Sequence, residues 1–239
     1  MSPRQAGLAP LRAVRVQHAR RVVTPDAEFE RGLAAHLRAT MTPKAVVELW
    51  GRFAHGTSEF DALMRRAVLR ALARRLGDGV RLEPGVGFLH AETFEIGDGV
   101  YVGAQAQLEG RSGGDCRIGA RVWIGPHVYL DARDLVVEDD VGLGAGVRIL
   151  GSAHTGVPAG VPVVETDLEP QPVRIEAGAE VGVNAVVMPG VTIGRGSMVG
   201  AGAVVTRDVP PMAVAVGVPA AVVRYRRTRR PKPAREAGP

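Results

Sequence analysis

The sequence predicts a mainly β protein built as a solenoid, and a six-residue repeat carries that prediction. Between residues 96 and 211 an aliphatic residue recurs every six positions, often followed by Gly or an acidic residue. Strands alternate with period two and helices with period 3.6, so a period of six indicates a short strand and a corner, stacked in coils. The aliphatic positions are Ile96, Val102, Leu108, Ile118, Ile124, Leu130, Val137, Leu143, Ile149, Ile175, Val181, Val187, Ile193, Val199 and Val205.

The spacing of coil starts predicts one long insertion. With three repeats per coil, the starts fall at Ile96, Ile118, Val137 and Ile175, which are 22, 19 and 38 residues apart. Because an ideal coil takes 18 residues, about 20 extra residues leave the solenoid before Ile175. We expect an extruded loop over 155–174, directly after a histidine, and long loops in regular folds are often functional.

The segment before the repeats predicts a helical cap over 43–80. One helix is expected from Pro43 to about Phe53, and a second begins at a capping signal around Ser58 and ends near Gly77. The cap would cover the open edge of the first coil. Residues 1–42 are interpreted as a largely flexible arm. The arginines of the second helix are interpreted as its solvated face: Arg65, Arg66, Arg70, Arg74 and Arg75.

Composition narrows the class of protein. The sequence has no apolar run long enough to span a bilayer, and its first 24 residues lack the apolar centre of a secretory signal, so we expect a cytoplasmic location. The single Cys116 rules out an internal disulfide and any multi-cysteine metal site.

The net charge of +5 is concentrated at the two ends of the chain. Residues 1–24 contribute +5 and residues 224–239 contribute +6, so the segment between them carries 5 − 11, or −6. An acidic body does not favour a nucleic-acid groove. We expect a β-helix domain over 81–220 and a disordered basic tail over 221–239.

Three segments resemble a known family. They are the Gly-Ser-x-His before the long loop, the run from Val191 to Pro211, and Val216-Gly217-Val218-Pro219-Ala220. Together with the repeats they resemble the left-handed β-helix, hexapeptide-repeat acyltransferases of the galactoside and maltose O-acetyltransferase type. The resemblance covers residues 43–224. It implies left-handed coils, acetyl-CoA as co-substrate, a sugar as acceptor, and a homotrimer with sites between subunits.

His154 is the candidate general base. Transfer of an acetyl group from a thioester to an alcohol needs a group that takes the hydroxyl proton, and a neutral imidazole can do so near pH 7. A covalent acyl-enzyme is not expected, because Cys116 has no cysteine-histidine signature around it. Ser152 is expected to point away from His154. The sequence therefore favours direct attack of the acceptor on the thioester, as the resemblance also implies.

The resemblance also implies a coenzyme A wall that offers mainly backbone groups. Carried over by position, this wall comprises Val183, Gly200, Ala201, Thr206, Arg207 and Arg224. One departure stands out, because many relatives have Val-Trp-Ile-Gly where this chain has Ala179-Glu180-Val181-Gly182. The pocket beside the donor is therefore expected to differ in shape.

The acceptor site is expected around four residues: His127, Asp131, Glu165 and Asp167. Transfer to an amine is the main alternative, because the same base and groove would serve it. A noncatalytic solenoid scaffold is a further alternative. A zinc-dependent carbonic anhydrase of the γ class needs a His-x4-His pair that the sequence lacks, and no metal is expected.

Overall fold

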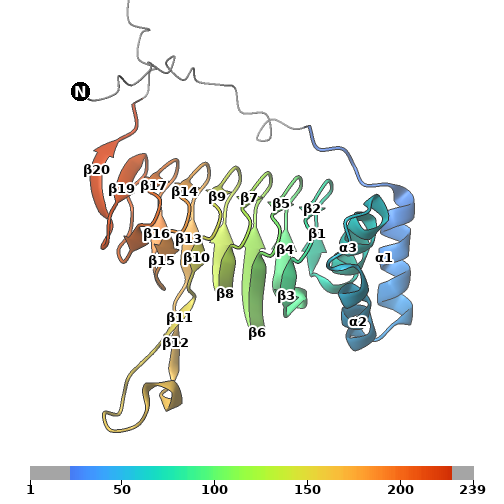
Figure 1. The fold of residues 1–239 in the computed structure, drawn as a ribbon, viewed down its shortest axis with the longest axis horizontal. Coiled ribbons are helices and arrows are strands. Elements are labelled where there is room, and N and C mark those ends of the chain that lie inside the picture. The colour runs from blue at the N-terminus through green and yellow to red at the C-terminus, as the bar shows by residue number, and fades with distance from the viewer. Residues whose placement is uncertain (1–21, 228–239) are drawn as a thin grey trace, which may run out of the picture.

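The structure is a computed structural model that describes residues 22–227. Within these residues three helices at one end are followed by a long solenoid of short strands (Figure 1). The helices are α1 (Glu28–Thr40), α2 (Pro43–Phe53) and α3 (Glu59–Leu72). The strands are β1 (Arg75–Leu76), β2 (Arg81–Leu82), β3 (Gly87–Leu89), β4 (Phe94–Ile96), β5 (Tyr101–Val102), β6 (Gln107–Ile118), β7 (Trp123–Ile124), β8 (Tyr129–Val137), β9 (Gly142–Leu143), β10 (Arg148–Ile149), β11 (Ser152–His154), β12 (Leu168–Pro170), β13 (Val173–Ile175), β14 (Glu180–Val181), β15 (Val186–Val187), β16 (Thr192–Ile193), β17 (Met198–Val199), β18 (Val204–Val205), β19 (Ala213–Val216) and β20 (Ala221–Tyr225).

The strand register confirms the predicted parallel solenoid. Strands β4, β6, β8, β13 and β16 pair in parallel, and this aligns Ile96, Ile118, Val137, Ile175 and Ile193 in one column. These residues include all four predicted coil starts. The fifteen predicted aliphatic positions are at most 3% exposed, so the six-residue repeat is the repeat of the core. The handedness of the coils stays a prediction from the resemblance.

The solenoid begins one coil earlier than predicted. Leu76 pairs with Ile96, Leu82 with Val102, and Phe88 with Leu108 of β6 in the next coil. The predicted helical cap over 43–80 is therefore wrong at its end, and so is the domain start at residue 81. Leu76-Gly77 and Leu82-Glu83 already follow the six-residue rule, whereas the predicted helix stops at Leu72 and not near Gly77.

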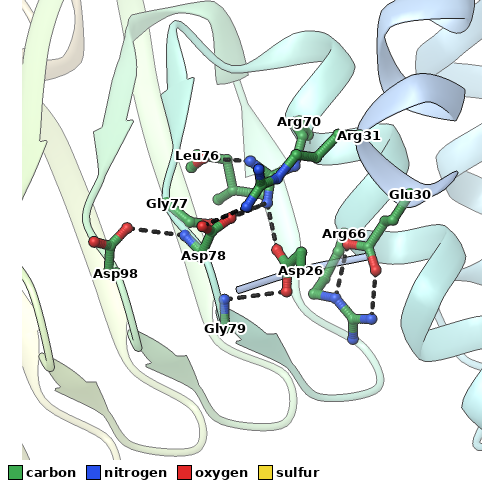
Figure 2. A network of polar contacts seen from close by, with 10 residues as sticks. All are labelled: Asp26, Glu30, Arg31, Arg66, Arg70, Leu76, Gly77, Asp78, Gly79 and Asp98. Atoms are coloured by element: carbon green, nitrogen blue, oxygen red, sulfur yellow. Dashed lines mark hydrogen bonds and ion pairs between the residues drawn. The ribbon is translucent and has the colours of Figure 1, made fainter. Parts of the chain in front are cut away.

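The predicted flexible arm contains helix α1, which is a correction to the interpretation of residues 1–42. Glu30 of α1 is buried and its carboxylate accepts two hydrogen bonds from Arg66, with N–O distances of 2.9 and 2.6 Å (Figure 2). Asp26 accepts from Arg70 at 2.5 Å and from the Gly79 N–H at 3.1 Å. These pairs between distant residues fix the segment from Asp26 onward against α3 and the first coil. Residues 1–21 of the predicted arm lie outside the described residues.

The solvated-face interpretation of the α3 arginines is wrong for three of them: Arg65, Arg66 and Arg70. The Arg65 side chain is 2% exposed and donates to the carbonyls of Phe53, Gly56 and Leu82 at 2.9, 2.6 and 2.9 Å. Arg70 donates to the carbonyls of Leu76 and Gly77. The arginines therefore join α3 to the segment after α2 and to the first turns of the solenoid, because carbonyls at chain turns lack strand partners.

The end of the solenoid also differs from the prediction. Strand β20 pairs antiparallel with β19, with Ala213 opposite Tyr225 and Val216 opposite Ala221. The basic tail predicted from residue 221 therefore begins with a strand, and residues 228–239 lie outside the described part of the chain. All other named pairs, except β11 with β12, are parallel.

Candidate active site

His154 lies on a two-stranded ribbon that leaves the solenoid. Strands β11 and β12 pair antiparallel, with Ser152 opposite Pro170 and His154 opposite Leu168, and the ribbon projects far from the stacked coils (Figure 1). Strand β10 pairs directly with β15 below it, so the coil register continues across the insertion. A long insertion is present as the repeat spacing predicts, but its bounds differ from the predicted 155–174: the ribbon begins at Ser152, and the chain has rejoined the solenoid at Val173.

One hydrogen bond defines the orientation of the His154 ring. Its Nδ1 lies 3.0 Å from the carbonyl oxygen of Thr166. A carbonyl oxygen can only accept a hydrogen bond, so Nδ1 carries the proton of the neutral ring. The lone pair of the neutral imidazole is then on Nε2, and the side chain is exposed. This is the protonation pattern that a general base requires.

Thr166 is the residue that holds this carbonyl in place. It is buried although it belongs to the long loop, and its hydroxyl donates to the Val163 carbonyl at 2.7 Å and accepts from the Gly156 N–H at 3.2 Å. The Thr155 N–H donates to the Asp167 carbonyl at 2.9 Å. The loop is therefore cross-linked internally around the histidine. The sequence did not indicate Thr166, because its role comes from a main-chain oxygen that any residue possesses.

Ser152 does not point away from His154, and that expectation is wrong. Residues i and i+2 of a strand lie on the same face, and β11 includes both. The Ser152 hydroxyl donates to the Asp131 carboxylate at 3.1 Å. Asp131, one of the predicted acceptor residues, therefore lies at the root of the ribbon and is buried.

His127 and Asp131 do not contact each other in the single chain, and their shared role at an acceptor stays a prediction. His127 is exposed at the turn before β8, four residues from Asp131, which places it roughly 13 Å away along an extended strand. It instead lies on the same edge as the predicted donor residues. The His127 N–H donates to the Ala104 carbonyl in the preceding coil. In later coils the N–H groups of Gly146, Asn184 and Gly202 make equivalent hydrogen bonds, so these residues occupy the same point of the coil.

The structure brings three predicted donor residues together on this edge. Val183 follows β14, and Gly200 and Ala201 follow β17 in the next coil. A Cβ at Gly182 would lie 2.6 Å from the Ala201 nitrogen, so only glycine permits this spacing. Val183 and Ala201 are exposed.

Thr206, Arg207 and Arg224 lie apart from that edge. Thr206 and Arg207 are exposed directly after β18, two strands along the same sheet from β10, which precedes the ribbon. Arg224 is exposed on β20 at the end of the solenoid. Neighbouring strands are about 4.8 Å apart, so Thr206 lies on the order of 10 Å from the root of the ribbon.

Glu165 and Asp167 are exposed on the ribbon on either side of Thr166. They are the sequence neighbours of the residue whose carbonyl contacts His154, and their contact with an acceptor stays a prediction. Two arginines that the sequence did not indicate, Arg111 and Arg133, lie next to Asp131. Reading residues 107–118 as one continuous strand would have revealed this pairing.

Glu180 stands where many relatives are expected to have a tryptophan, so a carboxylate replaces an aromatic ring at this point of the coil. Trp123 of β7 pairs with Gly142 of β9, and Gly142 pairs with Glu180 of β14. Trp123 therefore lies two coils from Glu180, at the same point of the coil. Trp123 stacks on Tyr101 with ring centroids 4.0 Å apart. Glu180 lies over Gly142, and burial raises the pKa of its carboxyl group.

A groove of about 690 Å³ lies on another edge of the solenoid, and none of the predicted site residues lines it. Its walls include Glu95, Asp98, Glu138, Asp139 and Arg195. Among residues 22–227 no three His, Cys, Asp or Glu side chains gather closely enough to hold a metal ion. No helix in that range is long and apolar enough to cross a membrane.

Comparisons with known proteins show which proteins the repeat is similar to. Residues 172–207 match the bacterial transferase hexapeptide family, described as six repeats. The chain is 29% identical to galactoside O-acetyltransferase of Escherichia coli over 160 residues, which are 67% of this chain and 68% of that protein. A Schizosaccharomyces pombe protein is 38% identical over 104 residues. That alignment spans 40% of this chain and only 45% of the relative.

Solved structures show the same fold. AntD, an N-acyltransferase from Bacillus cereus, superposes with a TM-score of 0.58 and 18% identity when bound to dTDP-4-amino-4,6-dideoxyglucose and coenzyme A, covering 66% of this chain and 86% of that one. A second AntD structure, with dTDP and coenzyme A, gives a TM-score of 0.59 over 73% of this chain and 91% of that one.

Proposed function

We propose that the chain transfers an acetyl group from acetyl-CoA to a hydroxyl of a sugar or sugar-containing small molecule, because part of its repeat matches the bacterial transferase hexapeptide family and a galactoside O-acetyltransferase is among its relatives. The observation that supports this most directly is the contact of His154 Nδ1 with the Thr166 carbonyl, from which the proton on Nδ1 is inferred. An exposed Nε2 lone pair on a ribbon held by its own hydrogen bonds is suited to remove a proton from a bound acceptor.

The proposed chemistry is a single transfer without an acyl-enzyme. Nε2 of His154 accepts the proton of the acceptor hydroxyl while that oxygen attacks the thioester carbonyl carbon. The imidazolium keeps its Nδ1–H on the Thr166 carbonyl, which stabilises the positive charge. As the carbon–sulfur bond breaks, the same ring returns the proton to the leaving sulfur. Cys116 takes no part, because it is fully buried.

Acetyl-CoA is proposed to lie along the edge formed by Val183, Gly200 and Ala201. The exposed residues Val183 and Ala201 and the absence of side chains at Gly182 and Gly200 favour close approach of a narrow pantetheine arm. Thr206, Arg207 and Arg224 are proposed to contact the other end, where the two arginines would pair with phosphates.

We propose a homotrimer whose sites lie between subunits, in the cytoplasm. The ribbon supports this, because it leaves a row of apolar side chains without cover in a single chain. These exposed residues are Val157, Val161, Val163, Val164 and Leu168. A neighbouring subunit would bury them and would bring a second wall to His154.

Transfer to an amine is the second candidate. An amine acceptor also loses a proton during attack, so His154 and the donor edge would serve it equally. The base geometry favours acyl transfer over a noncatalytic scaffold, which would have no use for an exposed, oriented imidazole.

The test is thiol release from acetyl-CoA over a panel of sugars, amino sugars and nucleotide sugars. Acceptor-dependent release in the wild type should fall about 100-fold or more in His154→Ala, with coenzyme A binding unchanged. His36→Ala is the matched control, because His36 is exposed on α1 at the far end of the molecule. Turnover that survives in His154→Ala would refute the assigned base. Absence of coenzyme A binding in the wild type would refute the transferase proposal.

A further inference from the structure

A cluster of charged side chains lies at the root of the His154 ribbon. Strands β6 and β8 are much longer than the other solenoid strands and pair side by side, with Glu109 opposite Asp131. Arg111 and Arg133 follow two residues later on each strand, on the same outward face. Ser152, the first residue of β11, closes the cluster from the next coil.

Asp131 is the centre of this cluster. It is only 7% exposed, and its two carboxylate oxygens lie 3.4 Å from Arg111 Nε and 3.6 Å from Arg133 Nε. Neither contact has hydrogen-bond geometry. Within residues 22–227, five buried side-chain nitrogens or oxygens lack a hydrogen-bond partner, and three of them are Arg111 Nε, Arg133 Nε and Asp131 Oδ1.

The terminal nitrogens of the two guanidinium groups also have few protein partners. Arg111 Nη2 lies 3.9 Å from the Glu109 carboxylate, which already accepts a hydrogen bond from the Tyr129 hydroxyl at 3.0 Å. The described residues provide no hydrogen bond to the terminal nitrogens of Arg133. The Arg111 and Arg133 side chains are only 34% and 21% exposed, so water solvates them incompletely. Half-buried guanidinium groups without acceptors are costly, and an anion would relieve that cost.

The cluster also lies at a suitable distance from the candidate base. Asp131 contacts Ser152, and Ser152 precedes His154 by two residues on the same face of β11. Two residues of extended strand span roughly 7 Å, about the width of a sugar ring.

We propose that Arg111 and Arg133 form a subsite for an anionic group, a carboxylate or a phosphate, on the acceptor whose hydroxyl faces His154. Asp131 attracts both guanidinium groups as an ion pair, at 3.4 and 3.6 Å from their Nε atoms, and the terminal nitrogens remain available to bind two oxygens of the anion. The inference rests on the proposed function and narrows it, because it selects acidic or phosphorylated sugars over neutral ones.

The first measurement is equilibrium binding of glucose, glucuronate and glucose 1-phosphate to the full chain with coenzyme A present. We expect at least one anionic sugar to bind 10-fold or more tightly than glucose, and the two anions separate a carboxylate site from a phosphate site. Arg133→Gln and Arg111→Gln should remove that preference and leave the weak binding of glucose unchanged. Arg133→Lys should retain part of it. Arg117→Gln is the matched control, because Arg117 lies on the same strand with an exposed side chain.

Thermal unfolding of each variant separates loss of binding from loss of folding. Equal affinity for glucose and both anions would overturn the subsite, and so would equal loss of neutral and anionic binding in a folded Arg133→Gln. These results leave His154-dependent transfer to neutral sugars intact. Anion binding that depends on Arg133 but gives no thiol release would instead support the subsite and refute the transferase proposal.

Discussion

Replacing Arg65 by methionine should destabilise the whole N-terminal end of the molecule. The buried guanidinium donates to three carbonyls, those of Phe53, Gly56 and Leu82. Hydrogen bonds from charged donors contribute about 1.5–3 kcal/mol each, or about 4.5–9 kcal/mol for three. Burial of the charge, which lowers the pKa of Arg65, offsets part of this. The expected net loss is about 3–5 kcal/mol.

The assay is urea unfolding of the full chain followed by circular dichroism, with Arg52→Met as control. Arg52 is exposed near the end of α2 and its replacement should cost less than about 0.5 kcal/mol. Arg65→Lys should be intermediate, because one ammonium group cannot match the spread of a guanidinium. If Arg65→Met unfolds within about 1 kcal/mol of the control, the three carbonyls are satisfied without Arg65 and the argument fails.

Three further predictions follow from single side chains. The raised pKa of Glu180 means that the folded state holds this proton more tightly than the unfolded state, so the group favours folding at low pH and opposes it as pH rises. Glu180→Gln should therefore raise Tm at pH 7 more than at pH 4, and an equal change at both would contradict this. Thr166→Val should lower kcat about 3–10-fold with little change in acceptor KM, because it loosens the carbonyl that orients His154; an unchanged kcat would remove that role. Burial strongly raises the pKa of Cys116, so a thiol reagent should modify it only as the protein unfolds, and rapid labelling at pH 7 would show that it is accessible.

The solenoid was predictable because each coil repeats one physical requirement. An inward aliphatic residue such as Ile124 or Val181 must recur at the same point of every coil. The spacing of these residues in the sequence therefore gives the register in which neighbouring coils pair. Helix α1 was not predictable in this way. It buries Glu30 as well as Ala34 and Leu37, so its contact with α3 depends on a carboxylate meeting Arg66 and leaves a weak apolar pattern.

The residues of the candidate site also fall into two groups, those that the sequence indicates and those that only the structure indicates. The sequence singles out His154 because it stands where the repeat breaks and within the Gly-Ser-x-His that resembles the family, and Ala201 by the resemblance; the roles of both stay predictions. Thr166, Arg111 and Arg133 were missed, because their partners come from register between β6 and β8 or from the fold of the ribbon. Charge pairs across coils leave no period in the sequence.

The direct pairing of β10 with β15 has a consequence for how such proteins diversify. Since the stack closes without the ribbon, the ribbon can change in length and sequence without a penalty to the core. Under the proposed function, whatever part of acceptor recognition the ribbon carries could vary, whereas the proposed donor edge is built from the repeat itself and is tied to the core. A scaffold of this kind would allow one donor to serve different acceptors.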